Sequence, residues 1–172
     1  MNLSDSRVID ADRASVWAAI LDPEVLKACV PGCQEMEGTP EEGFTATVVQ
    51  KVGPVKATFK GAVTLSDLQA PESVNITGEG KGGAAGFAKG GANVRLEAQG
   101  DQTVLHYDVE AKVGGKLAQL GSRIIDGFAK KMADQFFSNF QEHVGAPAPA
   151  QEPEPETSED APKKGWLKRL VS

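Results

Sequence analysis

The sequence lacks several features that would place the protein in common functional classes. It has no run of about 18 apolar residues, so no bilayer-spanning helix is predicted. Its opening residues, MNLSDSRVIDADRAS, contain no apolar stretch of the signal-peptide type, and we expect a cytosolic protein. The net charge of −6 argues against general nucleic-acid binding, which requires a basic face that displaces counterions.

Residues that ligate metals or attack substrates are also scarce. The two cysteines, Cys29 and Cys33, lie in CVPGC, far in sequence from the two histidines, His106 and His143. Because the second half of a zinc site is missing, we interpret the cysteines as reduced thiols around a Pro-Gly turn. No serine occupies a nucleophile elbow and no thiol–histidine constellation occurs, so the sequence predicts no catalytic residues.

A glycine-rich stretch formally matches a nucleotide-binding motif. Residues 78–83, GEGKGG, satisfy G-x-G-x-x-G, but the chain continues into a predicted strand rather than a helix. A dinucleotide site needs a helix N-terminus beside the pyrophosphate, so this function is not expected. We interpret residues 78–91 as a flexible hairpin connection. The alternative is a mobile lip at a cavity mouth, with Phe87 as an apolar plug.

The composition changes sharply after His143. Residues 145–162, GAPAPAQEPEPETSEDAP, contain no large apolar residue, so we expect a disordered, extended linker. Residues 1–144, 145–162 and 163–172 carry net charges of −5, −5 and +4. The sequence therefore predicts one folded domain (1–144), a linker (145–162) and a basic tail (163–172).

Apolar–polar alternation predicts a β-rich domain with two short helices near its start. The opening NLSDSRVID is predicted as a strand, Asp12 can cap a helix that begins near Arg13, and residues 23–30 form a second short helix. Further strands are predicted in FTATVV, VKATFKGAVTL, SVNITGEG, NVRLEAQ and TVLHYDVEAKV. Short turns such as Gly100-Asp101 favour an antiparallel sheet with one apolar face.

The last apolar segment, KLAQLGSRIIDGFAKKMADQFFSNFQEHV, has helical periodicity. It predicts one helix of about 26 residues that covers the apolar face of the sheet, with Gly145 as a stop. The predicted fold class is α+β, of helix-grip type. A curved antiparallel sheet of about six or seven strands wraps around a long C-terminal helix, and two short helices follow the first strand.

Three blocks carry a resemblance to a known family: VPGCQEMEG (30–38), VGPVKATFKGAVTL (52–65) and VGGKLAQLGSRIIDGFAKKMADQFFSNF (113–140). In order and spacing they resemble the family of the carbon monoxide dehydrogenase G subunit, part of the START-like (SRPBCC) superfamily of helix-grip folds. The similarity extends over about residues 1–143. It implies a non-catalytic accessory protein that holds a molybdenum hydroxylase at the inner face of the cytoplasmic membrane. The superfamily further implies an apolar cavity for lipids, polyketides or similar ligands.

The face of the sheet toward the long helix supplies the candidate cavity residues. Small residues on this predicted face leave space beneath the helix, although a filled core is the alternative; they are Ala46, Ala57, Gly61, Ala98 and Ala111. The hypothetical ligand cavity is lined by Phe44, Val48, Phe59, Val63, Phe87, Tyr107, Leu117, Leu120, Ile124, Phe128 and Met132.

The tail has the pattern of a short amphipathic helix that forms at a membrane surface. Ten residues are too few for a stable helix in water, but an interface can bury the apolar side and attract the cations. The predicted membrane-binding residues are Lys163, Lys164, Trp166, Leu167, Lys168, Arg169, Leu170 and Val171. The alternatives are a solubilising tail and a docking peptide for a protein groove.

Three functional hypotheses follow. The first is an adaptor that contacts a molybdenum hydroxylase and recruits it to anionic lipid, as a peripheral protein on the inner face of the cytoplasmic membrane. The second is a carrier of a quinone or another lipid without an anchoring role; this bound molecule is the only non-protein group expected. The third is a polyketide-cyclase-like enzyme, which ranks last because Tyr107 is the only titratable group on the predicted inner face.

Overall fold

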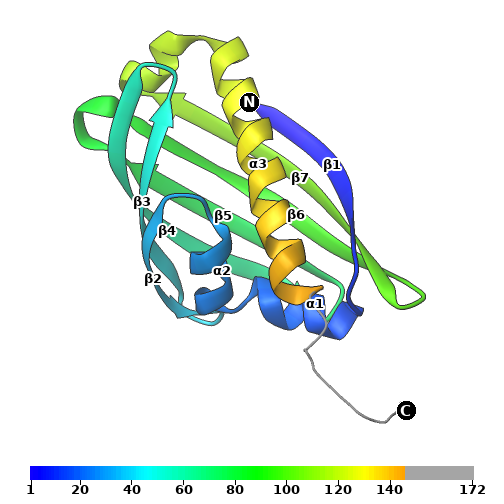
Figure 1. The fold of residues 1–172 in the computed structure, drawn as a ribbon. Helices are drawn as coiled ribbons and strands as arrows, with labels where there is room; N and C mark the ends of the chain where they lie inside the picture. Colours follow the sequence, from blue (N-terminus) through cyan, green and yellow to red (C-terminus); the bar gives the residue numbers. More distant parts are fainter. Residues whose placement is uncertain (146–172) are drawn as a thin grey trace, which may run out of the picture.

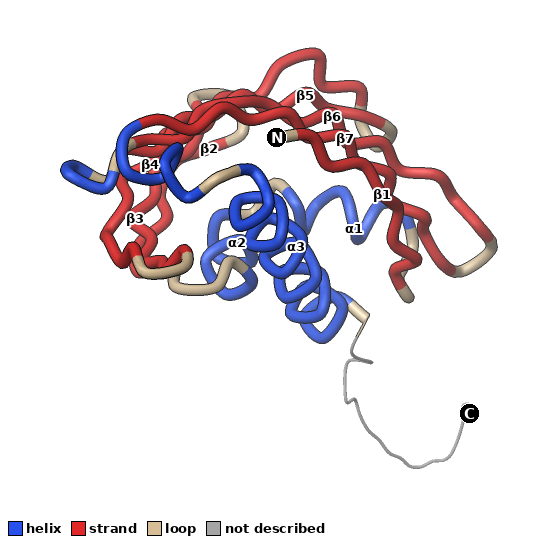
Figure 2. Tube along the Cα trace, turned by 90° about the horizontal axis from the view of Figure 1, so that it is seen from above, coloured by secondary structure: helices blue, strands red, loops and turns tan. Residues whose placement is uncertain are grey.

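Seven antiparallel strands form a single sheet that arches over the helices (Figures 1 and 2). The computed structural model describes residues 1–145. The sheet order is β1-β7-β6-β5-β4-β3-β2, so every neighbouring pair except β1 and β7 is consecutive in the chain. The strands are β1 (Asn2–Ile9), β2 (Cys33–Thr39), β3 (Gly43–Val52), β4 (Val55–Gln69), β5 (Ser73–Lys81), β6 (Phe87–Gln99) and β7 (Gln102–Gly114).

The helices lie on the concave side of this arch (Figure 2). The long helix α3 crosses the sheet, and α1 and α2 lie near its C-terminal end (Figure 1). The bounds are α1 (Arg13–Ile20), α2 (Pro23–Cys29) and α3 (Ser122–Val144), with 3₁₀ segments η1 (Gly83–Ala85) and η2 (Gly115–Leu120). The predicted α+β helix-grip class is therefore confirmed, with seven strands.

Side-chain caps fix where the short helices begin. The Asp12 carboxylate accepts a hydrogen bond from the Ser15 backbone N–H at 3.2 Å, as expected for the residue preceding α1. Hydrogen bonds from the Ser15 hydroxyl and N–H lower the pKa of Asp12. Asp22 accepts from the N–H of Glu24 at 2.9 Å, and Pro23 opens α2. Both predicted starts are confirmed.

The long helix is shorter than its apolar periodicity predicts. It begins at Ser122, and the segment containing Leu117 and Leu120 is the 3₁₀ turn η2. Gly121 separates the two with a φ of +89°, a left-handed conformation that interrupts an α-helix. A 3₁₀ turn and an α-helix place apolar residues at similar spacings, so periodicity alone did not distinguish them.

The glycine-rich residues 78–91 are mostly strand rather than a flexible connection, which corrects the prediction. Gly78 pairs with Gly90 across β5 and β6, and only residues 82–86 connect the strands. A Cβ on Gly90 would lie 2.0 Å from the carbonyl oxygen of Glu110 on β7. Glycine is needed there because the neighbouring backbone approaches too closely for a side chain.

The buried apolar residues form two separate clusters. The main core gathers residues from the sheet, α1, α2 and the end of α3: Ile9, Val16, Ala19, Val25, Cys29, Val74, Val94, Leu96, Leu105, Tyr107 and Phe140. The small core joins the end of β3, η2 and the start of α3: Val52, Leu117 and Ile125. Thus α3 is packed tightly near each of its ends.

Phe140 anchors α3 in the main core, and we predict that Phe140→Ala lowers the free energy of unfolding by about 3–5 kcal/mol. The side chain is 0% exposed, so its removal leaves a cavity in close-packed surroundings. Urea unfolding measures this value. Ile124→Ala on the same helix is the control, because Ile124 is 42% exposed and should change stability by about 1 kcal/mol or less. Equal losses in the two variants would contradict the assigned anchor.

Candidate functional site

A cavity of about 530 Å³ lies between the sheet and α3, between the two cores. The sheet and the N-terminal residue contribute Met1, Leu3, Gln50, Val52, Phe59, Gly80, Ala88, Ala92, Val94, Tyr107, Val109, Ala111 and Val113. The helices and their flanking segments contribute Val30, Pro31, Leu117, Ile125, Phe128, Ala129, Met132, Ala133, Phe136 and Phe137. Only Gln50 and Tyr107 among these residues have polar side chains, so the cavity is almost entirely apolar.

Small residues on facing elements create this space. Gly80, Ala88 and Ala92 line it from β5 and β6, and Ala129 and Ala133 line it from α3. Larger side chains at these positions would meet between sheet and helix and fill the interior. The middle of α3 is accordingly only half-buried where it faces the sheet, whereas its two anchoring residues are buried. The cavity is a consequence of side-chain size, not of an irregular backbone.

Aromatic rings form one wall of the cavity. The Phe137 ring stacks on Tyr107 of β7, with 5.2 Å between centroids, and meets Phe136 edge-on at 5.1 Å. Phe136 in turn stacks on the buried Phe140 at 5.8 Å. These contacts connect the cavity wall rigidly to the main core.

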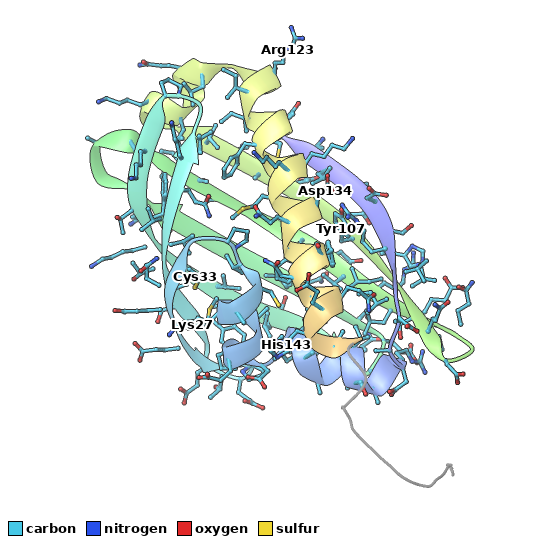
Figure 3. All side chains as sticks on the ribbon, viewed as in Figure 1. Lys27, Cys33, Tyr107, Arg123, Asp134 and His143 are labelled. Atoms are coloured by element: carbon cyan, nitrogen blue, oxygen red, sulfur yellow. The ribbon has the colours of Figure 1, made fainter. Side chains whose placement is uncertain are left out.

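Hydrogen bonds connect β1 to α3 beside this wall, at Tyr107 and Asp134 (both labelled in Figure 3). Arg7 Nη2 donates to the Asp134 carboxylate at 2.6 Å and to the Tyr107 hydroxyl at 3.2 Å, and its guanidinium lies 5.1 Å from the Phe137 ring centroid. Burial lowers the pKa of Arg7, but the hydrogen bonds to Asp134 and Tyr107 outweigh it and leave that pKa raised. The Tyr107 hydroxyl accepts this hydrogen bond, and its own hydrogen has no acceptor among residues 1–145.

Two side-chain amides, one on β3 and one on α3, hold the segment at the C-terminal end of α2 in place beside the cavity. Gln50 of β3 donates to the Pro31 carbonyl at 2.5 Å, and Asn139 of α3 donates to the Cys29 carbonyl at 3.0 Å. Both bonds hold the end of α2 against its neighbours. The amide of Gln50 already has this backbone acceptor, and the Tyr107 hydroxyl already accepts from Arg7.

The cysteines that flank the Pro31-Gly32 turn are both free. Burial raises the pKa of the Cys29 thiol and of the Cys33 thiol, so neither is favoured as a thiolate at neutral pH. In the part of the chain that the structure describes, no three His, Cys, Asp or Glu side chains gather as metal ligands. His106 lies within 3.0 Å of Glu97 on the outer face of the sheet.

The structure places five of the eleven predicted cavity residues in the cavity wall: Phe59, Tyr107, Leu117, Phe128 and Met132. The other six lie elsewhere: Phe44, Val48, Val63, Phe87, Leu120 and Ile124. Alternation along a strand identifies the correct face of a sheet, but not which part of that face lies opposite a helix. Phe44 is buried and pairs with Val63, and neither lines the cavity; Val48 does not line it either, although its partner Phe59 does.

Three of these misplacements have local causes. Ile124 is 42% exposed because the helix turns its neighbour Ile125 inward. Phe87 is 38% exposed and covers Gly114, where a Cβ would lie 2.2 Å from the ring, so it is not a plug in the cavity. Leu120 packs against the small core from η2.

Several lining residues were not predicted, although the sequence contains their signal. Gln50 and Val52 continue the alternation of Phe44 and Val48 by two and four positions. Among the predicted small residues, Ala111 lines the cavity, whereas Ala98 is exposed. The alanines of β6 and α3, which face each other across the cavity, indicate its position better than the predicted small residues do. The predicted membrane-binding residues 163–172 and all but the first residue of the predicted linker lie outside the described residues.

Comparisons with known proteins identify relatives of this domain. The family model for the carbon monoxide dehydrogenase G subunit (CoxG) matches residues 6–145. A search of the curated proteins found none that matches the chain. Among solved structures, a conserved protein from Geobacillus kaustophilus is similar, with a TM-score of 0.78 and 28% identity. That match covers 84% of this chain and 95% of the other.

More distant structures share the fold. A START superfamily protein from Mycobacterium smegmatis matches with a TM-score of 0.63 and 14% identity, over 83% of this chain and 95% of that one. A protein from Chromobacterium violaceum matches with a TM-score of 0.62 and 16% identity, over 84% and 98% of the two chains. The fold is therefore START-like, as predicted.

We predict that Ala92→Leu leaves the free energy of unfolding within about 1 kcal/mol of the parent value or raises it, because the added atoms enter empty apolar space. Ala19→Leu is the matched control: Ala19 is 8% exposed in the main core, and overpacking there should cost about 1–3 kcal/mol. Urea unfolding of both variants measures the difference. A loss in Ala92→Leu as large as in Ala19→Leu would mean that the cavity is filled in solution.

Proposed function

Because the chain belongs to the CoxG family, that of the carbon monoxide dehydrogenase G subunit, we propose that it is a non-catalytic accessory protein of a molybdenum hydroxylase. In this role it recruits an enzyme of the carbon monoxide dehydrogenase type to the inner face of the cytoplasmic membrane and holds a quinone or another lipid. The observation that carries the ligand-binding part is the apolar cavity of about 530 Å³ beneath α3. Its volume is within the range of natural small-molecule sites.

A ligand-binding role fits the side chains better than catalysis does. General acid–base chemistry needs a titratable group positioned at the reacting atoms, usually with a second group that tunes it. The cavity wall provides one phenol and one amide, and the phenol already accepts a hydrogen bond from Arg7. These residues favour binding over the polyketide-cyclase-like alternative.

Tyr107 favours a ligand with a carbonyl oxygen. Its hydroxyl accepts from Arg7, and in this proposal its own hydrogen is donated to a ligand acceptor. The Arg7 cation draws electron density from the hydroxyl and strengthens it as a donor. A quinone combines an apolar ring and tail with carbonyl oxygens, and therefore suits both the cavity wall and this donor. A dehydrogenase at the membrane passes its electrons to the respiratory chain, and a quinone is too insoluble to leave the bilayer unaided. A protein that carries the quinone would bring the two together.

The membrane role is supported by the composition of the tail. Within residues 1–145, no helix is long and apolar enough to cross a bilayer. The four cations of residues 163–172 provide about 4 kcal/mol at most toward anionic lipid, and Trp166 with its aliphatic neighbours adds apolar burial. Attachment of this strength is reversible. A carrier without an anchoring role remains the alternative.

A flotation experiment tests recruitment. We predict that the partner molybdenum hydroxylase floats with phosphatidylglycerol-containing vesicles when the full chain is present, and remains in the dense fraction with a chain that ends at Pro162. The physical reason is the loss of the four tail cations. Vesicles of phosphatidylcholine alone are the control for charge. Equal flotation of the enzyme with both chains would remove the tail's assigned role.

Two matched probes test the ligand class. We predict that Tyr107→Phe weakens the binding of 2-methyl-1,4-naphthoquinone about fivefold, the effect of one hydrogen bond worth about 1 kcal/mol. The affinity for 2-methylnaphthalene, which has the same rings without carbonyls, should not change. Quenching of intrinsic fluorescence or calorimetry measures both. Equal weakening for the two probes would contradict the carbonyl assignment, and no binding of either probe to the parent would contradict the ligand-binding function.

A further inference from the structure

Charge is segregated within the folded domain, and one end is basic. We name this the Met1 end: it comprises residues 51–60 around the β3–β4 turn, residues 79–91 around η1, and residues 110–127 from the end of β7 to the start of α3 (Figure 1). These segments adjoin one another. A Cβ on Gly53 would lie 3.5 Å from Ile124, and one on Gly115 would lie 2.6 Å from the Gly86 Cα. The segments carry a net charge of +5, whereas the rest of residues 1–144 carries −10.

The basic residues of the Met1 end repel one another. Lys51 lies directly opposite Lys56 across β3 and β4, and Lys60 lies opposite Lys81 across β4 and β5. Like charges directly opposite on a sheet are destabilising, so these pairs do not serve the fold. All four lysines are exposed, and none is in a salt bridge with another residue of the described chain. Their arrangement points to an anionic partner.

More cations complete this surface. Lys89 lies between Glu79 of β5 and Lys112 of β7, Lys116 lies in η2, and Arg123 projects from the first turn of α3 (Figure 3). The carboxylates within the same segments are Glu79, Glu110 and Asp126. Eight cations against three carboxylates leave the end strongly positive.

The Met1 end also exposes large apolar side chains. Phe87, at the start of β6, is 38% exposed, and Ile124, at the start of α3, is 42% exposed. Apolar groups surrounded by cations are the combination that an anionic bilayer surface attracts: the cations meet the headgroups and the apolar groups enter the interface. The small core belongs to this end: Val52, Leu117 and Ile125 lie in its segments, and all three line the cavity.

We propose that the Met1 end of the domain docks on anionic phospholipid, with the cavity directed toward the bilayer. The inference rests on the proposed membrane location but assigns a contact that is independent of the tail. The acidic remainder of the domain enforces the orientation, because an anionic surface repels it. At physiological salt this field decays over about 8 Å, so only the end nearest the surface contributes strongly.

The position of the tail permits both contacts. In Figure 1 the C-terminal end of α3 lies at the opposite end of the domain from the start of that helix, where the Met1 end is. The 23 residues of α3 span about 35 Å. The 18 residues 145–162 can reach about 60 Å when fully extended. The tail can therefore contact the bilayer on which the Met1 end is docked.

A tryptophan reporter tests the docked orientation in the full chain. Phe87→Trp and, as the matched control, Leu68→Trp are each made together with Trp166→Phe, which removes the tail's own tryptophan. Leu68 is similarly exposed, at 43%, but lies on β4 near the β4–β5 turn, outside the Met1 end. With vesicles of brominated phosphatidylglycerol and phosphatidylcholine, we expect bromine quenching for Phe87→Trp and none for Leu68→Trp.

A charge exchange tests the attraction. Lys56→Glu with Arg123→Glu should weaken vesicle binding at least about 30-fold, because two attractions of about 1 kcal/mol each are lost and each glutamate adds a repulsion. Lys27→Glu with Arg95→Glu makes the same change in net charge outside the Met1 end and should have a much smaller effect. If Lys56→Glu with Arg123→Glu weakened binding of the molybdenum hydroxylase and left vesicle binding unchanged, the Met1 end would be a contact for the enzyme and the lipid assignment would be wrong.

The outcomes separate this inference from the proposed function. If the chain binds vesicles but neither reporter is quenched, the tail alone attaches the protein and the docked orientation is wrong. Quenching of both reporters would likewise overturn it, because the domain would then have no fixed orientation. If the full chain does not bind the vesicles at all, the membrane part of the proposed function fails as well.

Discussion

The separation of α3 from the sheet is the constraint on which the rest of the structure depends. Ile125 holds the helix near one end and Phe140 near the other, and both are buried. Between them, alanines on the helix face glycine and alanine on β5 and β6, so the two layers do not close. A continuous core would bury more apolar surface and contribute more stability. The fold forgoes that stability over the length of the cavity, which is the pattern expected of a binding protein.

The two ends of the cavity differ in strength. On one side lies a main core of eleven buried residues, reinforced by stacked aromatic rings and by the Arg7–Asp134 ion pair. On the other side lies a small core of three buried residues, flanked by Gly115 and Gly121 in left-handed conformations. Local opening free energy decreases with the apolar contact that must be broken. The end that carries the small core is therefore the one where local opening costs less free energy.

The sequence was sufficient for the fold but only partly for the cavity. Alternation of period two and a helical apolar stripe identify the sheet face and the covering helix, and Asp12 and Pro23 fix two helix starts. Neither pattern gives the rotation of a helix to within one residue, so Ile124 was predicted where Ile125 points inward. Nor does alternation show where along a strand the helix crosses, which misplaced Phe44 and Val63. The break at Gly121 depends on a backbone angle that many glycines can adopt.

The basic Met1 end also provides part of the cavity wall, so the charge of this end and the use of the cavity can be related. An apolar ligand leaving a bilayer for an exposed cavity must cross water unless the opening lies at the lipid surface. The Met1 end carries the small core, the exposed Phe87 and Ile124, and the net positive charge, whereas the strong core lies toward the acidic remainder. An anionic bilayer would therefore attract the end with the smaller core and repel the end with the larger one. Orientation by charge would then reduce the water that a ligand must cross.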